Sequence, residues 1–295
     1  MAAGSKRLIG IAFVAVIVFW AARPATMQQR TSSAARIVSL VPALTEMLFA
    51  IGAGPQVIAV SSFDEFPPQV KSLPRVGALL DPDMERILAL RPDLVLSYGS
   101  QTDVQAQLSR ANIRVFSYRH AGLNGIFTTL KDLGAAVGRP ADADRLARDI
   151  RGGLDAIQAR VRRRPKPKTL LVFERDPASL RSVYVSGGVG FLHDMLDIAG
   201  GVNVFADVAR ESVQPSVETM LARAPEVILE VRATGLLAAA DVAQARRVWG
   251  ALASVPAVKE GRIEVLTGEH LVVPGPRVVQ GTEAFARALH PEAFK

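Results

Sequence analysis

The chain contains no cysteine among its 295 residues. A disulfide scaffold, a thiolate metal site and a lipid-modified cysteine are therefore excluded, and the redox compartment stays open. Histidine is scarce as well, and the four that occur share no spacing typical of a helical zinc motif. They are His120, His193, His270 and His290. A dedicated histidine cluster for zinc or manganese is therefore not expected.

Sequence signals of catalysis are also missing. No G-x-S-x-G elbow occurs, and the glycine-rich segment SGGVG at 186–190 lacks the Lys-Ser/Thr continuation of a phosphate-binding loop. We interpret this segment as a tight turn from a strand into a helix, and we predict no enzymatic activity. The alternative is a membrane-anchored α/β enzyme that uses the turn, which predicts that changing Gly187 or Gly188 abolishes turnover.

The formal net charge is +7, and the densest basic run is RRRPKPK at 162–168. This run directly follows a helical pattern, which favours a solvated helix end and linker. No zinc-finger spacing, basic heptad region or aromatic-rich basic strand accompanies it. We therefore expect no nucleic-acid partner.

The first residues have the layout of an export signal. Lys6 and Arg7 precede an apolar run at 8–22, and Arg23 and a polar stretch follow it. The run is short for a membrane span, and no clean small-x-small cleavage pattern follows. A cleaved signal and a retained anchor are both compatible with this segment. Either places the protein in the periplasm or on the outer face of the cytoplasmic membrane.

The rest of the chain reads as an alternation of buried strands and amphipathic helices. Such alternation favours a largely parallel sheet flanked by helices, and therefore an α/β fold. The strands are expected at 36–40, 57–60, 94–98 and 113–118, with helices at 43–52 and 123–137.

A long helix is predicted over 141–164, because its apolar stripe stays in register across Gly152 and Gly153. The segment TLLVFE at 169–174 then begins a second α/β series. We therefore expect two lobes joined by one helix. The boundaries are 1–34 for the export signal or anchor with its linker, 35–139 for the first lobe, 140–167 for the bridging helix and linker, and 168–295 for the second lobe.

An internal repeat supports two lobes of common design. PDMERILALRPDLVLS at 82–97 aligns without gaps to PSVETMLARAPEVILE at 215–230. Each copy predicts a helix that begins with proline, carries a carboxylate near its positive end and leads into a buried strand. Six positions are identical: Pro82 with Pro215, Glu85 with Glu218, Leu88 with Leu221, Ala89 with Ala222, Pro92 with Pro225 and Leu96 with Leu229.

Glu85 and Glu218 have two interpretations from the residues alone. A glutamate in the first turn can simply complement the helix dipole, which contributes under about 1 kcal/mol. Two carboxylates presented by two similar lobes could instead engage two arginines of a two-fold symmetric partner.

Ring-bearing and small residues gather where the predicted strands end, which is where open α/β sheets bind ligands. Such a cleft suits a large planar or polycyclic ligand. His120 and His270 lie in these loops and are candidates to coordinate the metal of a bound chelate. The other members are Pro42, Phe63, Phe66, Tyr98, Tyr118, Tyr184 and the segment 267–276.

Several segments together resemble the periplasmic solute-binding proteins of ABC importers, of the cobalamin and ferric-siderophore type. The resemblance runs from about Arg36 to the C-terminus. It is carried by RIVSLVPALTEMLFAIG at 36–52, SSFDEFPP at 61–68, LPRVG at 73–77, PDMERILALRPDLVL at 82–96, AGGVNVF at 199–205, PSVETMLARAPEVI at 215–228 and PGPRV at 274–278.

The resemblance implies two lobes bridged by a long helix, no catalysis, no intrinsic cofactor and a monomer. It implies that Glu85 and Glu218 dock onto arginines of an ABC permease dimer. The implied ligand is cobalamin or another metal chelate, namely a ferric siderophore or haem. Two positions where cobalamin-binding members often carry tryptophan fall on Leu79 and Ser212, which leaves the ligand open. The implied ligand-binding positions are Pro42, Phe66, Tyr98, Tyr184, Glu269 and His270.

Besides a solute-binding protein and an α/β enzyme, a third possible class of protein is a structural or adhesion module with an empty cleft. If the chain is of this class, no small ligand should raise its melting temperature.

Overall fold

The computed structural model describes Met1 and residues 34–233 and 239–295. The predicted export signal or anchor therefore lies almost entirely outside the described residues. Within them, no helix combines the length and the apolar character needed to cross a bilayer.

The first lobe is built on a four-stranded sheet in the order β2-β1-β3-β4, in which all pairs are parallel. Parallel neighbours need crossover connections, and helices provide them here on both faces of the sheet. The strands are β1 Ile37–Ser39, β2 Val57–Val60, β3 Leu94–Tyr98 and β4 Arg114–Tyr118. The helices are α1 Pro42–Ala50, α2 Met84–Ala89, α3 Thr102–Arg110 and α4 Leu123–Ala136, with short turns η1 Gly54–Gln56 and η2 Pro68–Ser72.

The second lobe has a mixed sheet in the order β10-β9-β5-β6-β8, with β7 paired to β5. β9 and β10 run parallel to β5, whereas β6 and β8 form antiparallel pairs at the other edge. The strands are β5 Lys168–Glu174, β6 Tyr184–Ser186, β7 Val202–Asn203, β8 Ser212–Val213, β9 Val227–Arg232 and β10 Ile263–Thr267. The helices are α6 Phe191–Ile198, α7 Val217–Arg223, α8 Ala239–Trp249, α9 Pro256–Lys259 and α10 Val278–Leu289, with short turns η3 Gly250–Leu252, η4 Glu269–Leu271 and η5 Pro291–Phe294.

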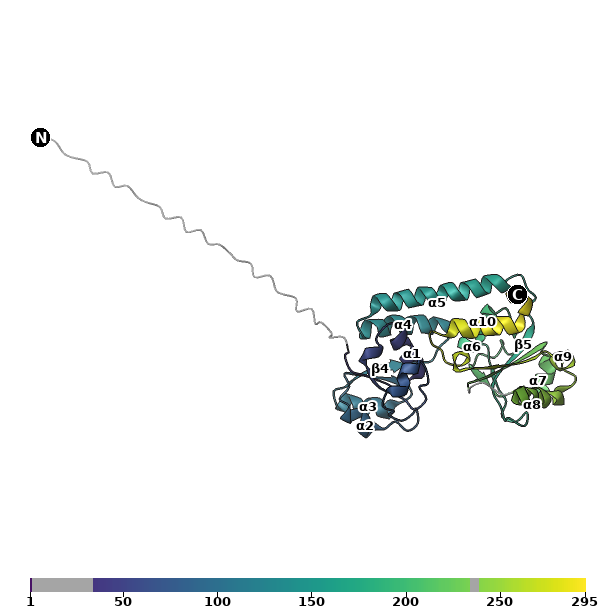
Figure 1. Ribbon diagram of the computed structural model, residues 1–295, viewed down its shortest axis with the longest axis horizontal. Coiled ribbons are helices and arrows are strands. Elements are labelled where there is room, and N and C mark those ends of the chain that lie inside the picture. The colour runs from purple at the N-terminus through teal and green to yellow at the C-terminus, as the bar shows by residue number, and fades with distance from the viewer. Residues whose placement is uncertain (2–33, 234–238) are drawn as a thin grey trace. The chain divides into compact units, whose positions relative to one another are not determined.

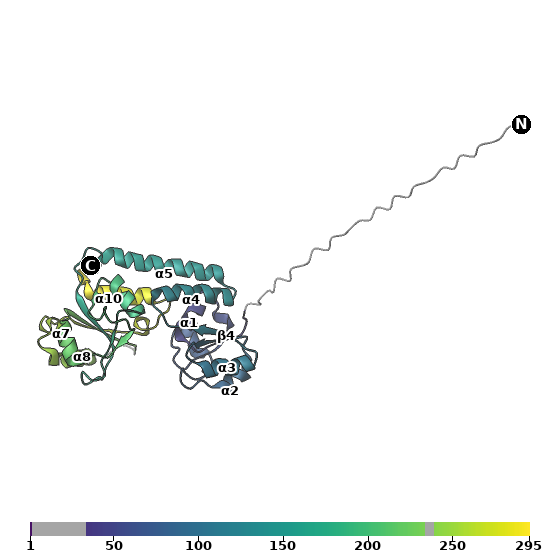
Figure 2. The ribbon, with the colours of Figure 1, turned by 180° about the vertical axis from the view of Figure 1, so that it is seen from behind.

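The long helix α5 spans Pro140–Val161 and lies along α4 of the first lobe and α10 of the second, as Figures 1 and 2 show from opposite sides. The predicted bridging helix is thus confirmed. Its two glycines sit in different surroundings. A Cβ at Gly152 would meet no atom within 4 Å, whereas one at Gly153 would lie 2.7 Å from Cγ1 of Val279 on α10. Glycine at 153 therefore lets the two helices approach closely.

The internal repeat is reproduced in the backbone. Helix α2 begins at the position that matches the start of α7, and β3 begins at the position that matches the start of β9. Asp83 and Ser216 cap these helices, each accepting a backbone N–H bond three residues on. Both copies then turn through a left-handed residue at the same register, Arg91 with φ 47° and Ala224 with φ 46°. The two-lobe fold with similar halves is confirmed.

The two copies differ at one buried position. Ser97 in β3 accepts a hydrogen bond from the Gln105 amide at 3.3 Å. Its counterpart in β9 is Glu230, whose carboxylate is 2% exposed. Glu230 accepts hydrogen bonds from three side chains of the second lobe, and this satisfies a buried charge that would otherwise be costly. The donors are Arg175 Nε at 3.0 Å, Arg232 Nε at 2.8 Å and Trp249 Nε1 at 2.8 Å.

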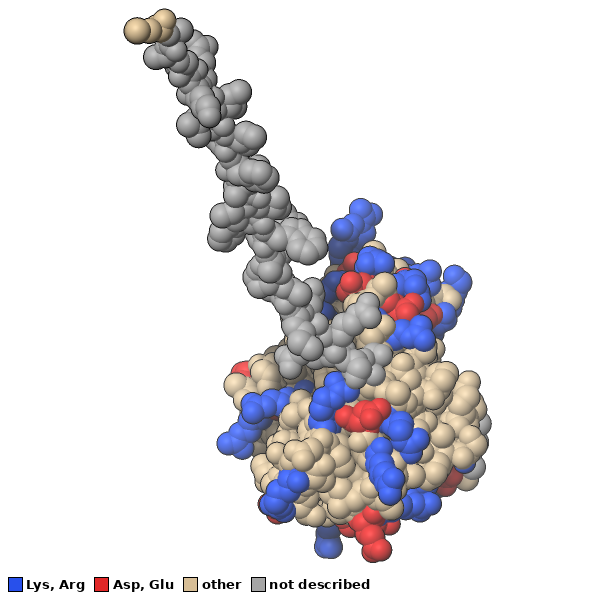
Figure 3. Space-filling model, turned by 90° about the vertical axis from the view of Figure 1, so that its left-hand side faces the viewer, with Lys and Arg blue, Asp and Glu red and all other residues tan. Residues whose placement is uncertain are grey.

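Charged side chains of both signs are scattered among uncharged surface on the face drawn in Figure 3. The described residues form no continuous basic stripe there. Part of the run at 162–168 is paired with acidic groups, since Arg164 lies 3.8 Å from Glu292 and Lys166 lies 3.6 Å from Asp197. Two cations of this run therefore have acidic partners at the surface.

Candidate functional site

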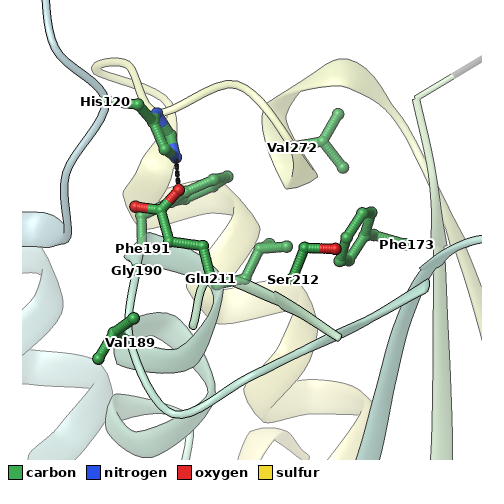
Figure 4. Close-up of a pocket in the computed structure, with 9 residues that line it drawn as sticks. His120, Phe173, Val189, Gly190, Phe191, Glu211, Ser212 and Val272 are labelled. Carbon is green, nitrogen blue, oxygen red and sulfur yellow. Dashed lines mark ion pairs between the residues drawn. The ribbon is translucent and has the colours of Figure 1, made fainter. Parts of the chain in front are cut away.

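A cavity of about 310 Å³ opens where the two lobes face each other. His120 reaches it from the loop after β4 of the first lobe, and the remaining lining comes from the second lobe (Figure 4). Its walls are mainly aromatic and aliphatic, with one imidazole and one carboxylate. The lining residues are His120, Phe173, Val189, Gly190, Phe191, Leu192, Glu211, Ser212 and Val272.

A row of rings leads from the first lobe into this cavity. Tyr98 and Tyr118 meet edge to face with centroids 5.8 Å apart, and the His120 ring lies 6.4 Å beyond Tyr118. His120 in turn meets Phe191, the first residue of α6, at 5.2 Å and 89°. Such perpendicular contacts fix ring orientation and add to apolar burial. Burial also raises the pKa of both tyrosines, which therefore stay neutral at physiological pH.

His120 carries the cavity's main polar contact. Its Nε2 lies 3.9 Å from Glu211 Oε2, and its Nδ1 lies 3.4 Å from the Tyr118 hydroxyl. Burial lowers the pKa of the His120 imidazole, and the nearby Glu211 carboxylate opposes that shift. At a given pH, the His120 imidazole is therefore neutral more often than a solvent-exposed histidine.

The first two glycines of the glycine-rich turn after β6 use their N–H groups in backbone hydrogen bonds. Gly187 N donates to Glu211 O at 3.1 Å, and Gly188 N donates to Val208 O at 2.8 Å. A Cβ at Gly187 would lie 2.0 Å from the Arg210 carbonyl oxygen, and one at Gly188 would lie 2.1 Å from that of Ala206. These glycines are needed because the 206–211 segment crosses directly against them. The turn serves packing and offers no phosphate cradle at these two residues.

A second polar contact joins the lobes beside η4. Arg277, just before α10, donates from Nε to Glu46 of α1 at 2.9 Å and lies 3.5 Å from Glu269. Its guanidinium stacks over the Phe66 ring at 4.0 Å from the centroid. Glu46 is 4% exposed, and burial raises its pKa against the opposing effect of Arg277. The contact therefore ties α1 to the start of α10.

A third inter-lobe contact caps α4. Gly122 precedes this helix and has no side chain to accept the first free N–H groups. Asp194 of α6 accepts instead from Leu123 N at 2.8 Å. A Cβ at residue 122 would lie 2.4 Å from Asp194 Oδ2, so glycine makes room for the carboxylate. A side chain of one lobe thus caps a helix of the other.

None of the six predicted ligand-binding residues is among those that line the cavity. Tyr98 connects to it through Tyr118, and the Tyr184 ring, at the start of β6, lies 6.4 Å from that of Phe173. Their role in binding stays a prediction. Pro42 begins α1, Phe66 stacks on Arg277, and Glu269 and His270 form part of η4.

His120 and Ser212, both singled out in the sequence, do line the cavity. So do Val272 of the segment 267–276 and Val189 and Gly190 of the glycine-rich segment 186–190. Those that sequence reasoning missed include Phe173, Phe191 and Glu211. Phe173 lies near the carboxyl end of a predicted strand and Phe191 directly follows the glycine-rich turn, so the strand-end rule could have found both. Nothing in the local pattern marks Glu211.

Glu85 and Glu218 are both exposed in the first turns of α2 and α7. They occupy the same helix position in the two copies. A backbone N–H bond lowers the pKa of Glu218, with help from the Ser216 hydroxyl. Their role in docking stays a prediction.

Known proteins share this architecture. Residues 37–269 match the family described as periplasmic binding protein. The uncharacterized ABC transporter substrate-binding lipoprotein YvrC of Bacillus subtilis (strain 168) is 30% identical over 268 residues, which cover 88% of this chain and 81% of the relative. The vitamin B12-binding protein of Salmonella typhimurium is 29% identical over 259 residues, covering 87% and 91%.

Solved structures agree. The periplasmic vitamin B12 binding protein BtuF of Vibrio cholerae superposes with a TM-score of 0.73 at 25% identity, covering 89% of this chain and 98% of that one. The periplasmic heme-binding protein RhuT from Roseiflexus sp. RS-1, in apo form, gives 0.75 at 29% identity, covering 88% and 98%. With a match over most of its length, the chain belongs to the periplasmic binding protein family and is a substrate-binding protein of ABC-transporter type, not an enzyme.

Proposed function

We propose that this chain captures a metal-containing macrocycle between its lobes, a corrinoid such as cobalamin in the first place, and delivers it to a membrane permease. The observation that carries the proposal is the aromatic and aliphatic lining of the inter-lobe cavity, with only His120 and Glu211 as ionisable groups in it. A broad ring system with apolar faces suits such walls, because the surface that it buries is mostly apolar.

Relatives with named ligands support this class. Proteins similar to this chain are named vitamin B12-binding, and others of similar structure are named heme-binding. Both ligands are metal macrocycles. Haem is therefore the second candidate, and a ferric siderophore is the third. Leu79 is 39% exposed and Ser212 lies in the cavity wall, and neither side chain supplies an aromatic face for a corrinoid.

The test is a titration with cyanocobalamin, haem and ferric siderophores, followed by ligand absorbance and thermal unfolding. A true ligand at 100 times its Kd stabilises the folded state by about 2.7 kcal/mol. We expect one-to-one cobalamin binding that Tyr98→Ala weakens. The control is Phe294→Ala, because the Phe294 ring stacks on Arg160 in the C-terminal turn, and this variant should leave binding unchanged. Binding of an iron chelate alone would retain the transport role and reject cobalamin. If every ligand fails to shift the melting temperature, the proposal is wrong and the empty-cleft alternative gains.

We further propose that Glu85 and Glu218 are the docking carboxylates. They stand at equivalent positions of two similar lobes, so they present two negative charges that suit two arginines of a dimeric permease. In vesicles that contain the permease, Glu85→Ala with Glu218→Ala should abolish uptake and leave ligand affinity unchanged. Asp103, an exposed carboxylate in the first turn of α3, is the matched control. Equal loss with Asp103→Ala would reject a specific role for the pair.

The apolar segment at 8–22 would either direct export or hold the protein at the outer face of the cytoplasmic membrane. A monomeric body with one cleft meets the needs of such delivery. Mass spectrometry of the mature N-terminus separates the two fates, since cleavage removes this segment and a retained anchor keeps it.

A further inference from the structure

We propose that a second cavity, within the second lobe, binds a small oxyanion, namely phosphate, sulfate or a small carboxylate. This arginine cavity encloses about 240 Å³, and its walls include Phe173, Glu174, Arg175, Glu230 and Arg232. The proposal goes beyond the proposed function, because it requires no cargo between the lobes.

The arginine cavity lies at the carboxyl ends of two parallel neighbours, β5 and β9. Glu174 is the last residue of β5, and Arg232 is the last residue of β9. From these strands the chain continues in opposite directions across the sheet, since β6 lies beyond β5 and β10 lies beyond β9. Open α/β sheets bind ligands in the crevice at such a switch of strand order. The topology therefore favours a ligand at this point of the second lobe.

Two positive charges share one buried carboxylate in this cavity. The side chains of Arg175 and Glu230 are 1% and 2% exposed, and that of Arg232 is 23% exposed. Both arginines donate to Glu230 through Nε, Arg175 at 3.0 Å and Arg232 at 2.8 Å. Glu174 also lines the cavity, but it is exposed, so water and salt screen its charge. A bound anion would therefore balance the second guanidinium charge.

Both guanidinium groups keep N–H donors for an anion. Arg175 Nη1 donates to the carbonyl oxygens of Asp176 at 2.7 Å and Pro177 at 3.1 Å, whereas its Nη2 is buried and has no acceptor among the described residues. Arg232 uses Nε and Nη2 on Glu230, and in the part of the chain that the structure describes its Nη1 has no acceptor either.

Such donors fit an oxyanion. A buried charged N–H group without an acceptor is costly, and a bound anion removes that cost. The planar fork of a guanidinium also matches the spacing of carboxylate and phosphate oxygens. Arg232 is the more exposed of the two arginines, so an entering anion meets it first.

The arginine cavity differs in character from the inter-lobe cavity. Phe173 lines both, and among the described residues the two share no other lining residue. The inter-lobe cavity has mainly aromatic and aliphatic walls, whereas charged side chains make up half of the lining here. Its volume is several times the ~30 Å³ share of one water in the liquid, which leaves room for a polyatomic anion. The two cavities therefore suit ligands of different chemistry.

The experiment titrates the full chain, without cargo, with sodium phosphate, sodium sulfate and sodium acetate. Sodium chloride at matched ionic strength is the reference, and thermal unfolding and isothermal titration calorimetry follow binding. We expect at least one of the three oxyanions to raise the melting temperature of the wild type in a saturable manner, beyond the effect of chloride.

Three variants locate the site. Arg232→Gln removes the more exposed guanidinium and should weaken oxyanion binding at least about tenfold. Glu174→Gln removes a negative charge from the cavity wall and should strengthen binding about two- to fivefold. Because Glu174 is exposed, this variant tests the site even if Arg232→Gln fails to fold. The matched control is Arg145→Gln, which changes an exposed arginine of α5 paired with Asp142 and should bind as the wild type does.

Equal stabilisation of the wild type by chloride and by all three oxyanions would show a general effect of salt and overturn the proposal. Equal oxyanion affinity in the wild type, Arg232→Gln and Glu174→Gln would overturn it as well, because binding would then lie elsewhere. Since cargo is absent throughout, either result leaves the proposed transport function standing. Circular dichroism of each variant shows whether the fold is retained.

Discussion

Replacing glycine with alanine should have opposite effects on stability at two adjacent positions of α5. Gly152→Ala places a methyl group in open space on an exposed helix face. It should stabilise the fold by about 0.8–1.0 kcal/mol, the difference in helix propensity between the two residues. Gly153→Ala gains the same propensity, but its Cβ would lie 2.7 Å from Val279 Cγ1. That separation is about 0.8 Å shorter than an ordinary contact between two carbon atoms. Overpacking of this kind costs about 1–3 kcal/mol.

The net prediction is that the two variants differ by about 1–3 kcal/mol in the free energy of unfolding. Urea unfolding followed by far-UV circular dichroism measures both against the wild type, with midpoints compared at a shared slope. Val279→Ala combined with Gly153→Ala should recover much of the loss, because it removes the two crowded methyl groups. Equal stabilisation by both single variants would show that α10 does not pack closely on α5 at Gly153, and would refute the reasoning.

Three contacts of the second lobe give further predictions. Arg277→Met should lower the free energy of unfolding by about 3–5 kcal/mol, because it leaves the Glu46 carboxylate buried without its partner. Adding Glu46→Gln should recover part of this loss, and additive losses in the double variant would argue against a pair. Asp194→Ala should cost about 1 kcal/mol by uncapping α4 at Leu123, and a loss below a few tenths in urea melts would exclude the cap. Burial lowers the pKa of His290, so its contribution to stability is present above about pH 6.5 and is lost as pH falls through the lowered pKa. His290→Gln should therefore lose less melting temperature than the wild type between pH 7.5 and 5.5, and an equal loss would contradict the assigned shift.

Local sequence patterns were sufficient for most of the fold. The apolar stripe predicted α5 at nearly its observed bounds, and the ungapped repeat predicted two similar lobes. The matched corners at Arg91 and Ala224 were not predicted, since neither residue is a glycine and only the structure shows their left-handed backbone. Such features depend on neighbours a few residues apart, so a pattern in the chain can specify them.

The site was less predictable, because its contacts join distant parts of the chain. Arg277 and Glu46 are 231 positions apart, and Leu123 and Asp194 are 71 apart. The strand-end rule identified the correct edge of each sheet but not which side chains point into the cavity. Tyr98, an expected ligand-binding residue, does not line the cavity, whereas His120, expected only as a candidate metal ligand on the loop after the neighbouring strand, does. Orientation at a loop depends on packing from the other lobe, which no local pattern contains.

The exchange of Ser97 for Glu230 between the two repeats gives the corresponding strands of the two lobes different side-chain bonding. Three side-chain donors, from the residue after β5, from β9 and from α8, converge on Glu230, so these segments are tied to one another by hydrogen bonds. The edge of the first lobe ends in a serine, an amide and phenol rings, which can each change rotamer without breaking an ion pair. We expect a ligand to meet a fixed surface on one side and an adjustable one on the other. A change of ligand among similar receptors would then be accommodated mainly by substitutions on the first lobe.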